Sequence, residues 1–234
     1  MGNPDPAYRR SPHNAGFQCI QELHLRLKAG ESEDLGAVIL RRGAHAGRSY
    51  VLARPLTWMN ASGRGVERLL RHLESDVKDL VVITDDMDLS LGDVRVRPGG
   101  GAGTHRGMRS LVDTLGRKDF ARIRIGIHPG EPCPDDLAEY VLTPMSGGGL
   151  ETLKAGIKRA AEAALDLLEC GDIYAVMNRT NRRTRRRDGS VSQSNALFAP
   201  PEGGGCRPVS RDGAAHAASI QKEEECIDRM KSGS

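Results

Sequence analysis

The stretch LVVITDDMD, at residues 80–88, joins a run of apolar and β-branched residues to a group of carboxylates. A short continuous apolar run is typical of a strand that is covered on both faces of a sheet. We expect this strand to span residues 80–84 and to end at Asp85. Ligands of open α/β sheets bind at the carboxyl ends of the strands. The stretch therefore predicts a buried strand with a candidate site at its end, and a solvated acidic turn is the alternative interpretation.

Helical and extended patterns follow one another on both sides of this strand. Apolar residues recur at helical spacing in some segments, and short apolar or alternating runs mark others as strands. We expect helices at residues 17–27, 66–73, 108–115 and 153–168, and further strands at 37–40, 50–53, 94–97 and 123–127. This mixture predicts a single α/β domain, with a twisted mixed sheet and helices on both of its faces.

The composition excludes a membrane protein. The chain has 234 residues, a net charge of +3 and a hydrophobic fraction of 38%. Its mean hydropathy is −0.45. No segment approaches the ~18 apolar residues of a membrane span, and the N-terminus has no apolar signal-peptide core. We therefore expect no membrane partner.

Positive charge gathers after the last predicted helix. The segment NRTNRRTRRR, at residues 178–187, holds six arginines in ten positions, and a Gly-, Ser- and Pro-rich stretch follows it. Too few large apolar residues lie there to offset the entropy lost on ordering. We expect a folded domain over residues 1–182 and a disordered tail over residues 183–234. Such an arginine cluster can contact phosphates without sequence preference; a solvated tail or a sorting signal is the alternative interpretation.

Two motifs carry candidate catalytic and binding groups. In PHNAG, at residues 12–16, His13 directly precedes a predicted helix. An imidazole with an ordinary pKa of ~6.5 is suited to general-base chemistry at neutral pH, and a capping or surface histidine is the alternative. In TWMNASG, at residues 57–63, Trp58 is either a core residue or a stacking platform, and Asn60 is either an N-cap or a substrate donor.

A glycine-rich turn, PGGGAGTHRG at residues 98–107, separates a predicted strand from a predicted helix. Backbone amides of such a turn can cradle an anion. The turn lacks the GxGxxG spacing of dinucleotide sites. We therefore expect neither a dinucleotide nor another cofactor, and the residues suggest no metal.

Taken in this order, the motifs resemble the bacterial-type peptidyl-tRNA hydrolases. The resemblance covers residues 2 to about 181. It rests on Asn3-Pro4, Tyr8, HNAG at 13–16, MNASG at 59–63, DDMDL at 85–89, GGGAGTHRG at 99–107, RIRIGI at 122–127, YVL at 140–142 and MNR at 177–179.

The resemblance implies a monomeric, cytoplasmic enzyme that hydrolyses the ester between a peptide and the terminal ribose of its tRNA. A mitochondrial or plastid location is the alternative. The resemblance gives His13 the role of general base and Asp85 that of its supporting carboxylate. It also implies a substrate-binding set and two phosphate-binding arginines. The substrate-binding set is Asn3, Tyr8, Trp58, Asn60, His105 and Arg106, and the phosphate-binding arginines are Arg97 and Arg124.

Three features depart from the family pattern. Arg106 stands where asparagine is usual, and Pro12 stands where an arginine commonly precedes the histidine. The sequence begins inside the turn that follows the family's first strand. Either the start lies upstream, or that strand is missing and its neighbours keep unpaired edges. Arg106, a missing first strand and the arginine-rich tail favour an alternative function. It is a catalytically weak RNA-binding scaffold of the same fold, like the plastid splicing factors for group II introns.

Overall fold

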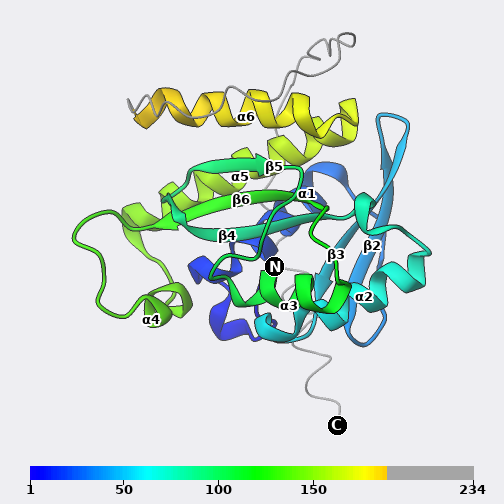
Figure 1. The fold of residues 1–234 in the computed structure, drawn as a ribbon, viewed down its shortest axis with the longest axis horizontal. Coiled ribbons are helices and arrows are strands. Elements are labelled where there is room, and N and C mark those ends of the chain that lie inside the picture. Colours follow the sequence, from blue (N-terminus) through cyan, green and yellow to red (C-terminus); the bar gives the residue numbers. More distant parts are fainter. Residues whose placement is uncertain (189–234) are drawn as a thin grey trace. The chain divides into compact units, whose positions relative to one another are not determined.

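The computed structural model describes residues 1–188, in which helices and strands alternate (Figure 1). Most of the predicted tail, residues 189–234, lies outside the described residues. The last helix, α6 (Ile173–Asp188), continues past residue 182, where we expected the folded domain to end. None of the helices among the described residues is both long and apolar enough to cross a membrane.

A mixed sheet forms the centre of the domain, as predicted. Its strands are β4 (Val81–Ser90), β5 (Val94–Arg97) and β6 (Ala121–His128), in the order β4-β6-β5. Strand β4 runs parallel to β6, and β5 runs antiparallel to it. The prediction for β4 was too short, because the strand continues through the carboxylates to Ser90.

The remaining strands form a second, antiparallel sheet rather than part of the first. It contains β1 (Ser32–Asp34), β2 (Val38–His45) and β3 (Arg48–Pro55), in that order. Ala46 and Gly47 join β2 to β3, with φ values of 49° and 77°. Positive φ at both central residues is typical of the tight turns whose twist matches a hairpin. Among residues 1–188, the two strand orders make β3 an end strand of one sheet and β4 an end strand of the other.

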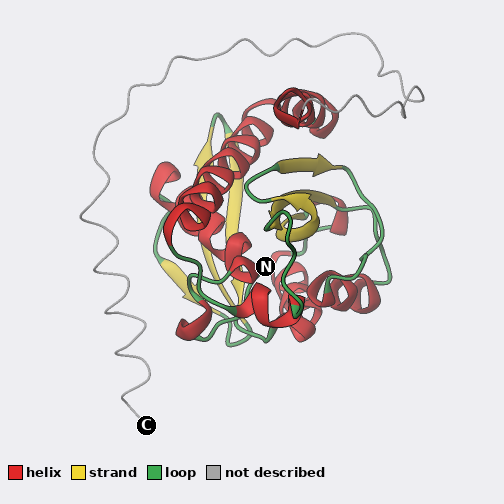
Figure 2. Ribbon diagram, turned by 90° about the vertical axis from the view of Figure 1, so that its left-hand side faces the viewer, coloured by secondary structure: helices red, strands yellow, loops and turns green. Residues whose placement is uncertain are grey.

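Helices cover both faces of the mixed sheet, which confirms the predicted layering (Figure 2). On one face, Ile83 and Ile125 pack with residues of α1 (Ala15–Leu27) and α5 (Gly147–Cys170). On the other, Val82 packs with residues of α2 (Ser62–Leu73) and α3 (Arg106–Leu115). Because successive side chains of a strand point to opposite faces, Asp85 shares the α1 face with Ile83.

Short elements complete the domain. The 3-10 turns are η1 (Pro6–Tyr8), η2 (Pro12–Asn14), η3 (Met59–Ala61) and η4 (Val77–Asp79), and a short helix α4 spans Leu137–Leu142. Helix α6 closes the free edge of β5: the side chain of Asn181 accepts from the Val96 amide at 2.9 Å and donates to the Val96 carbonyl at 3.2 Å. This side-chain amide thus satisfies the backbone N–H and C=O of Val96, which a further strand would otherwise bind.

We expect Leu153→Ala to lower the free energy of unfolding by about 2–5 kcal/mol, because it removes methyl groups from a packed core. Leu153 is 0% exposed and belongs to the buried cluster that includes residues of α1 and the mixed sheet. Urea unfolding followed by circular dichroism measures the loss. The neighbouring Lys154 is exposed, so Lys154→Ala should change stability by less than about 0.5 kcal/mol. Equal effects of the two substitutions would contradict this account of the core.

Candidate functional site

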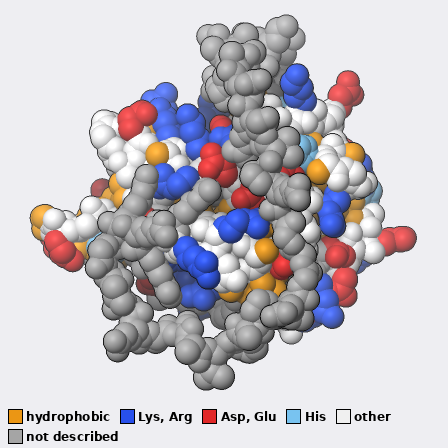
Figure 3. All heavy atoms as spheres, turned by 90° about the horizontal axis from the view of Figure 1, so that it is seen from above, with side chains coloured by type: hydrophobic (Ala, Val, Ile, Leu, Met, Phe, Trp, Pro, Cys, Tyr) orange, Lys and Arg blue, Asp and Glu red, His pale blue; other side chains and the backbone are white. Residues whose placement is uncertain are grey.

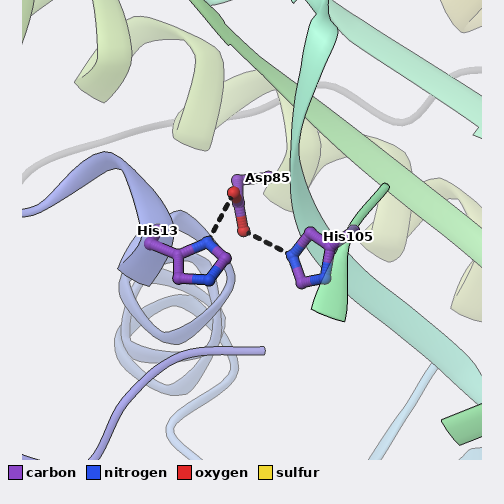
Figure 4. Close-up of side chains that lie close together, drawn as sticks. All are labelled: His13, Asp85 and His105. Atoms are coloured by element: carbon purple, nitrogen blue, oxygen red, sulfur yellow. Dashed lines mark hydrogen bonds and ion pairs between the residues drawn. The ribbon is translucent and has the colours of Figure 1, made fainter. Parts of the chain in front are cut away.

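A buried carboxylate lies between two imidazole rings, as Figure 4 shows. Asp85 Oδ2 lies 2.8 Å from His13 Nδ1, and Asp85 Oδ1 lies 3.0 Å from His105 Nε2. The side chain of Asp85 is only 3% exposed, whereas those of His13 and His105 are 14% and 13% exposed. The alternative of a solvated acidic turn is therefore wrong for Asp85, which belongs to strand β4.

The close approach of α1 to β4 brings His13 to Asp85. His13 lies in η2, the turn that leads directly into α1. At Gly16 a Cβ atom would stand 2.4 Å from the Ile83 carbonyl oxygen and 2.4 Å from the Met1 nitrogen. Only a residue without a side chain fits against this backbone. The glycine of the PHNAG motif thus sets the distance from the helix to the strand.

The first turn of α3 fixes the tautomer of His105. His105 is the N-cap of α3, and its Nδ1 accepts hydrogen bonds at 3.1 Å from the amides of Gly107 and Met108. A nitrogen that accepts two N–H groups carries no proton of its own. The proton of the neutral ring therefore lies on Nε2, from which it is donated to Asp85 Oδ1.

Asp85 is held in its ionised form. Burial by itself raises the pKa of this carboxyl, but the adjacent His105 and His13 rings outweigh burial and hold the pKa well below its usual range. The carboxylate accepts the Nδ1 proton of His13 through Oδ2. This bond leaves Nε2 of His13 as the nitrogen that can take up a proton.

Asn3 and Asn14 fasten the N-terminal segment to the loop that holds Asn60. The Asn3 amide donates to Asn14 Oδ1 at 2.8 Å, and Asn14 Nδ2 donates to the Asn3 carbonyl at 3.0 Å. Asn3 Oδ1 accepts from the Met59 amide at 2.9 Å. Asn14 was not among the predicted site residues, although the PHNAG motif contains it. Its position beside His13 was the available signal.

The two predicted aromatic residues lie together. The rings of Tyr8 and Trp58 meet edge to face, with their centroids 6.4 Å apart. Trp58 is 54% exposed, so the alternative that it is a core residue is wrong. Asn60 is also exposed and lies in η3, while Ala61 occupies the N-cap position of α2. The capping alternative for Asn60 is therefore wrong as well.

The glycine-rich turn uses its backbone groups within the protein. Arg122 donates to the carbonyls of Gly100 and Gly101, and the Gly100 amide donates to the Lys118 carbonyl at 3.0 Å. These two carbonyls support a buried guanidinium, and the Gly100 amide is already bonded within the protein. Arg106, at the first position of α3 beside His105, is exposed.

The two predicted phosphate-binding arginines differ in their surroundings. Arg97 is exposed at the end of β5. Arg124 on β6 is bonded to Asp86, and its guanidinium also lies 3.7 Å from Asp88. The charge of Arg124 is thus partly neutralised within the protein, which leaves Arg97 as the better placed of the two for an external anion.

His13, Asp85 and His105 also offer one ligand atom each within 4.8 Å of one another, a group that can in principle hold a metal ion. His13 Nδ1 and His105 Nε2 form the two imidazole–carboxylate hydrogen bonds. A metal bound through these two nitrogens would displace both of their protons.

Comparison with known proteins identifies the family. The family model described as peptidyl-tRNA hydrolase matches residues 1–188. The chain belongs to the peptidyl-tRNA hydrolase family. It is 39% identical over 189 residues to the peptidyl-tRNA hydrolase of Acidobacterium capsulatum, covering 78% of this chain and 93% of that protein. The enzyme of Koribacter versatilis is 37% identical over 206 residues, covering 88% of this chain and 94% of that protein.

A solved structure agrees with this membership. The crystal structure of peptidyl-tRNA hydrolase from Acinetobacter baumannii is 30% identical, with a TM-score of 0.70, and the match covers 77% of this chain and 91% of that one. The peptidyl-tRNA hydrolase family thus accounts for the mixed α/β fold as well as for the sequence motifs.

We expect Asp85→Asn to weaken the dependence of stability on acid pH. Because the folded-state pKa of Asp85 is depressed, the ionised carboxylate stabilises the protein above its unfolded pKa of ~3.9, and that stabilisation is lost as the pH falls further. Urea unfolding between pH 6 and pH 2 should therefore give a shallower slope below pH ~4 for the variant. Asp88 is 83% exposed, so Asp88→Asn is the control. An unchanged slope in Asp85→Asn would contradict the assignment.

Proposed function

We propose that this protein hydrolyses the ester bond of peptidyl-tRNA, with His13 as the general base. The observation that carries the proposal is the hydrogen bond from His13 Nδ1 to the buried, ionised Asp85. A carboxylate on Nδ1 holds the ring in the tautomer whose Nε2 can accept a proton, and it stabilises the imidazolium that forms. The membership of the peptidyl-tRNA hydrolase family supplies the substrate class.

The proposed reaction is the attack of water on the ester carbonyl. Nε2 of His13 takes a proton from water as the water oxygen bonds to the carbonyl carbon. The tetrahedral intermediate then collapses, the bond from carbon to the ribose oxygen breaks, and the imidazolium returns its proton to that oxygen. Free tRNA and the peptide acid are the products. Asp85 keeps its charge throughout and acts only on the orientation and charge of His13.

The neighbouring groups suit the two ends of this substrate. We assign the peptide backbone to the exposed amide of Asn60, and the discrimination of blocked from free amino groups to Asn3, which is bonded to the same loop. The pair of half-buried Tyr8 and exposed Trp58 suits a terminal base, since stacking contributes ~1–3 kcal/mol per base. His105 supports Asp85, and Arg106 beside it offers donors to an oxyanion or a phosphate.

Phosphate contacts are assigned to Arg97 first and to Arg124 second, because Arg124 is already paired with carboxylates. On the face shown in Figure 3, the visible Lys and Arg side chains form several separate groups, with Asp and Glu side chains among them. Contacts of this kind follow the shape and backbone of an RNA and weaken with salt.

A monomeric state and a cytoplasmic location are part of this proposal, and they follow from the family alone. The competing proposal was a catalytically weak RNA-binding scaffold. The relatives named above are hydrolases and give that proposal no support. The complete His13–Asp85 pair also favours the enzyme, because a scaffold has no need of a polarised imidazole.

We expect His13→Ala to lower kcat for peptide release by about 10²–10⁴-fold, the usual contribution of a general base. Affinity for tRNA should change little, because the ring lies at the reacting bond. Release of labelled peptide from peptidyl-tRNA measures the first effect, and filter binding measures the second. The half-buried His45 on β2, which pairs with Glu169, provides the matched control, and His45→Ala should keep full activity. Undiminished turnover by His13→Ala would refute the mechanism.

We expect Arg97→Ala to raise KM while leaving kcat close to that of the unmodified protein. Loss of one phosphate contact should also reduce the slope of log affinity against log salt by about 1. Titration of tRNA at several salt concentrations measures this slope. Arg71 on α2 is 76% exposed, and Arg71→Ala is the control for a general change in charge. The same slope for Arg97→Ala and the unmodified chain would remove Arg97 from the interface.

A further inference from the structure

The hydroxyl of Thr84 lies beside the hydrogen bond between His105 and Asp85. Thr84 Oγ1 is 2.9 Å from His105 Nε2, the same nitrogen that lies 3.0 Å from Asp85 Oδ1. Thr84 is only 3% exposed, so its hydroxyl has to find its hydrogen-bond partners within the protein. A hydroxyl, an imidazole and a carboxylate therefore meet around one ring nitrogen.

The place of Thr84 on β4 explains this contact. Because successive side chains of a strand point to opposite faces, Thr84 shares the α3 face with Val82. Asp85 lies on the opposite face, with Ile83 and α1. His105 begins α3. Its ring therefore approaches the carboxylate from the side of the strand to which Thr84 points.

The directions of these hydrogen bonds follow from the tautomer of His105. Nδ1 of this ring accepts from the amides of Gly107 and Met108, so the ring proton lies on Nε2. Thr84 Oγ1 can only accept from that N–H, and its own proton is directed to the Asp85 carbonyl oxygen, 3.3 Å away. The single Nε2 proton of His105 thus has two acceptors, the Thr84 hydroxyl and the Asp85 carboxylate.

We propose that Thr84 is a positioning residue for the general base, and that it acts through His105 and Asp85. Its hydroxyl takes a share of the His105 N–H, so the carboxylate is less neutralised from that side and keeps more negative charge for His13. A more negative carboxylate better stabilises the imidazolium of His13 as water loses its proton. This role rests on the proposed function, in which His13 is the general base.

Valine is the substitution that isolates the hydroxyl of Thr84. It keeps the β-branched shape that suits a strand, but its methyl group accepts no hydrogen bond. The Nε2 proton of His105 then goes to Asp85 alone. A methyl carbon also cannot stay at the 2.9 Å that the hydrogen bond allows, so the ring has to move away from it. Both consequences weaken the support that Asp85 gives to His13.

The test compares Thr84→Val with Thr84→Ser in the full chain. We expect Thr84→Val to lower kcat for peptide release by about 3–10-fold, the effect of one hydrogen bond on the transition state. KM should not change, because Thr84 is buried. Thr84→Ser restores the hydroxyl and should keep kcat within about twofold of that of the unmodified chain. The exposed Thr152 on α5 provides the matched control, and Thr152→Val should keep full activity.

The order of the two variants distinguishes this role from a purely structural one. Serine lacks the methyl group of threonine and favours strands less, whereas valine keeps the shape and the preference. A purely structural role would therefore make Thr84→Ser the more damaging change for both Tm and kcat. We expect the lower kcat in Thr84→Val. A kcat for Thr84→Val equal to or above that of Thr84→Ser would overturn the proposal.

The imidazole N–H of His105 gives a readout that does not depend on the substrate. Proton–nitrogen NMR of the labelled protein follows the Nε2 proton. Its resonance should move downfield in Thr84→Val, where the carboxylate alone accepts it, and should stay in place in Thr84→Ser. An unchanged resonance in Thr84→Val would mean that the hydroxyl takes no share of this proton, and the proposal would fail.

A second substitution tests whether Thr84 acts through His105. Asparagine is a good N-cap residue, so His105→Asn keeps the start of α3 and removes the imidazole. Thr84→Val should then cause no further loss of kcat. The same fold loss in both backgrounds would overturn the proposal. If His105→Asn turns over too slowly to measure, the comparison of valine with serine and the NMR resonance decide the matter.

Failure of this role can be told apart from failure of the proposed function. Undiminished turnover by His13→Ala would overturn the function itself. An inactive His13→Ala together with a fully active Thr84→Val would overturn only the role of Thr84.

Discussion

Two imidazole N–H groups share one buried carboxylate, and the arrangement of the site follows from the need to satisfy that charge. A buried carboxylate is costly unless hydrogen bonds surround it. Asp85 obtains them from residues 72 and 20 positions away in the chain. His105 also caps α3, so the same ring that stabilises the carboxylate begins a helix. Moving any of these elements would leave the carboxylate, the helix cap or the His13 ring without its partner.

The end strands of the two sheets differ in what lies along their outer edges. The outer edge of β5 is closed by Asn181, whose side-chain amide makes both bonds of a strand partner. The facing edges of β3 and β4 border a space lined by apolar side chains. Unpaired backbone groups on an edge strand invite pairing with another strand.

Local patterns predicted most of the helices and strands, and they failed where distant residues decide the outcome. The carboxylates after Thr84 predicted the end of the strand, yet β4 continues to Ser90. Arg124 pairs with Asp86, and the two imidazoles pair with Asp85, so the charges that would end a strand are compensated. No window of the sequence around residue 85 contains these partners. The strands at 37–40 and 50–53 were predicted as strands, but their membership of a second sheet depends on pairing that periodicity does not encode.

The sequence by itself determined the α/β class, the order of the elements and the residue types that can carry acid–base chemistry, because these depend on side-chain spacing and on motifs that are local in the chain. Only the tertiary structure decided which nitrogen of His105 carries the proton, that Asn14 binds Asn3, that Trp58 is exposed and that Arg124 is already paired. The physical reason is that hydrogen bonds and ion pairs are short and directional. They form between atoms that the fold brings together from distant parts of the chain.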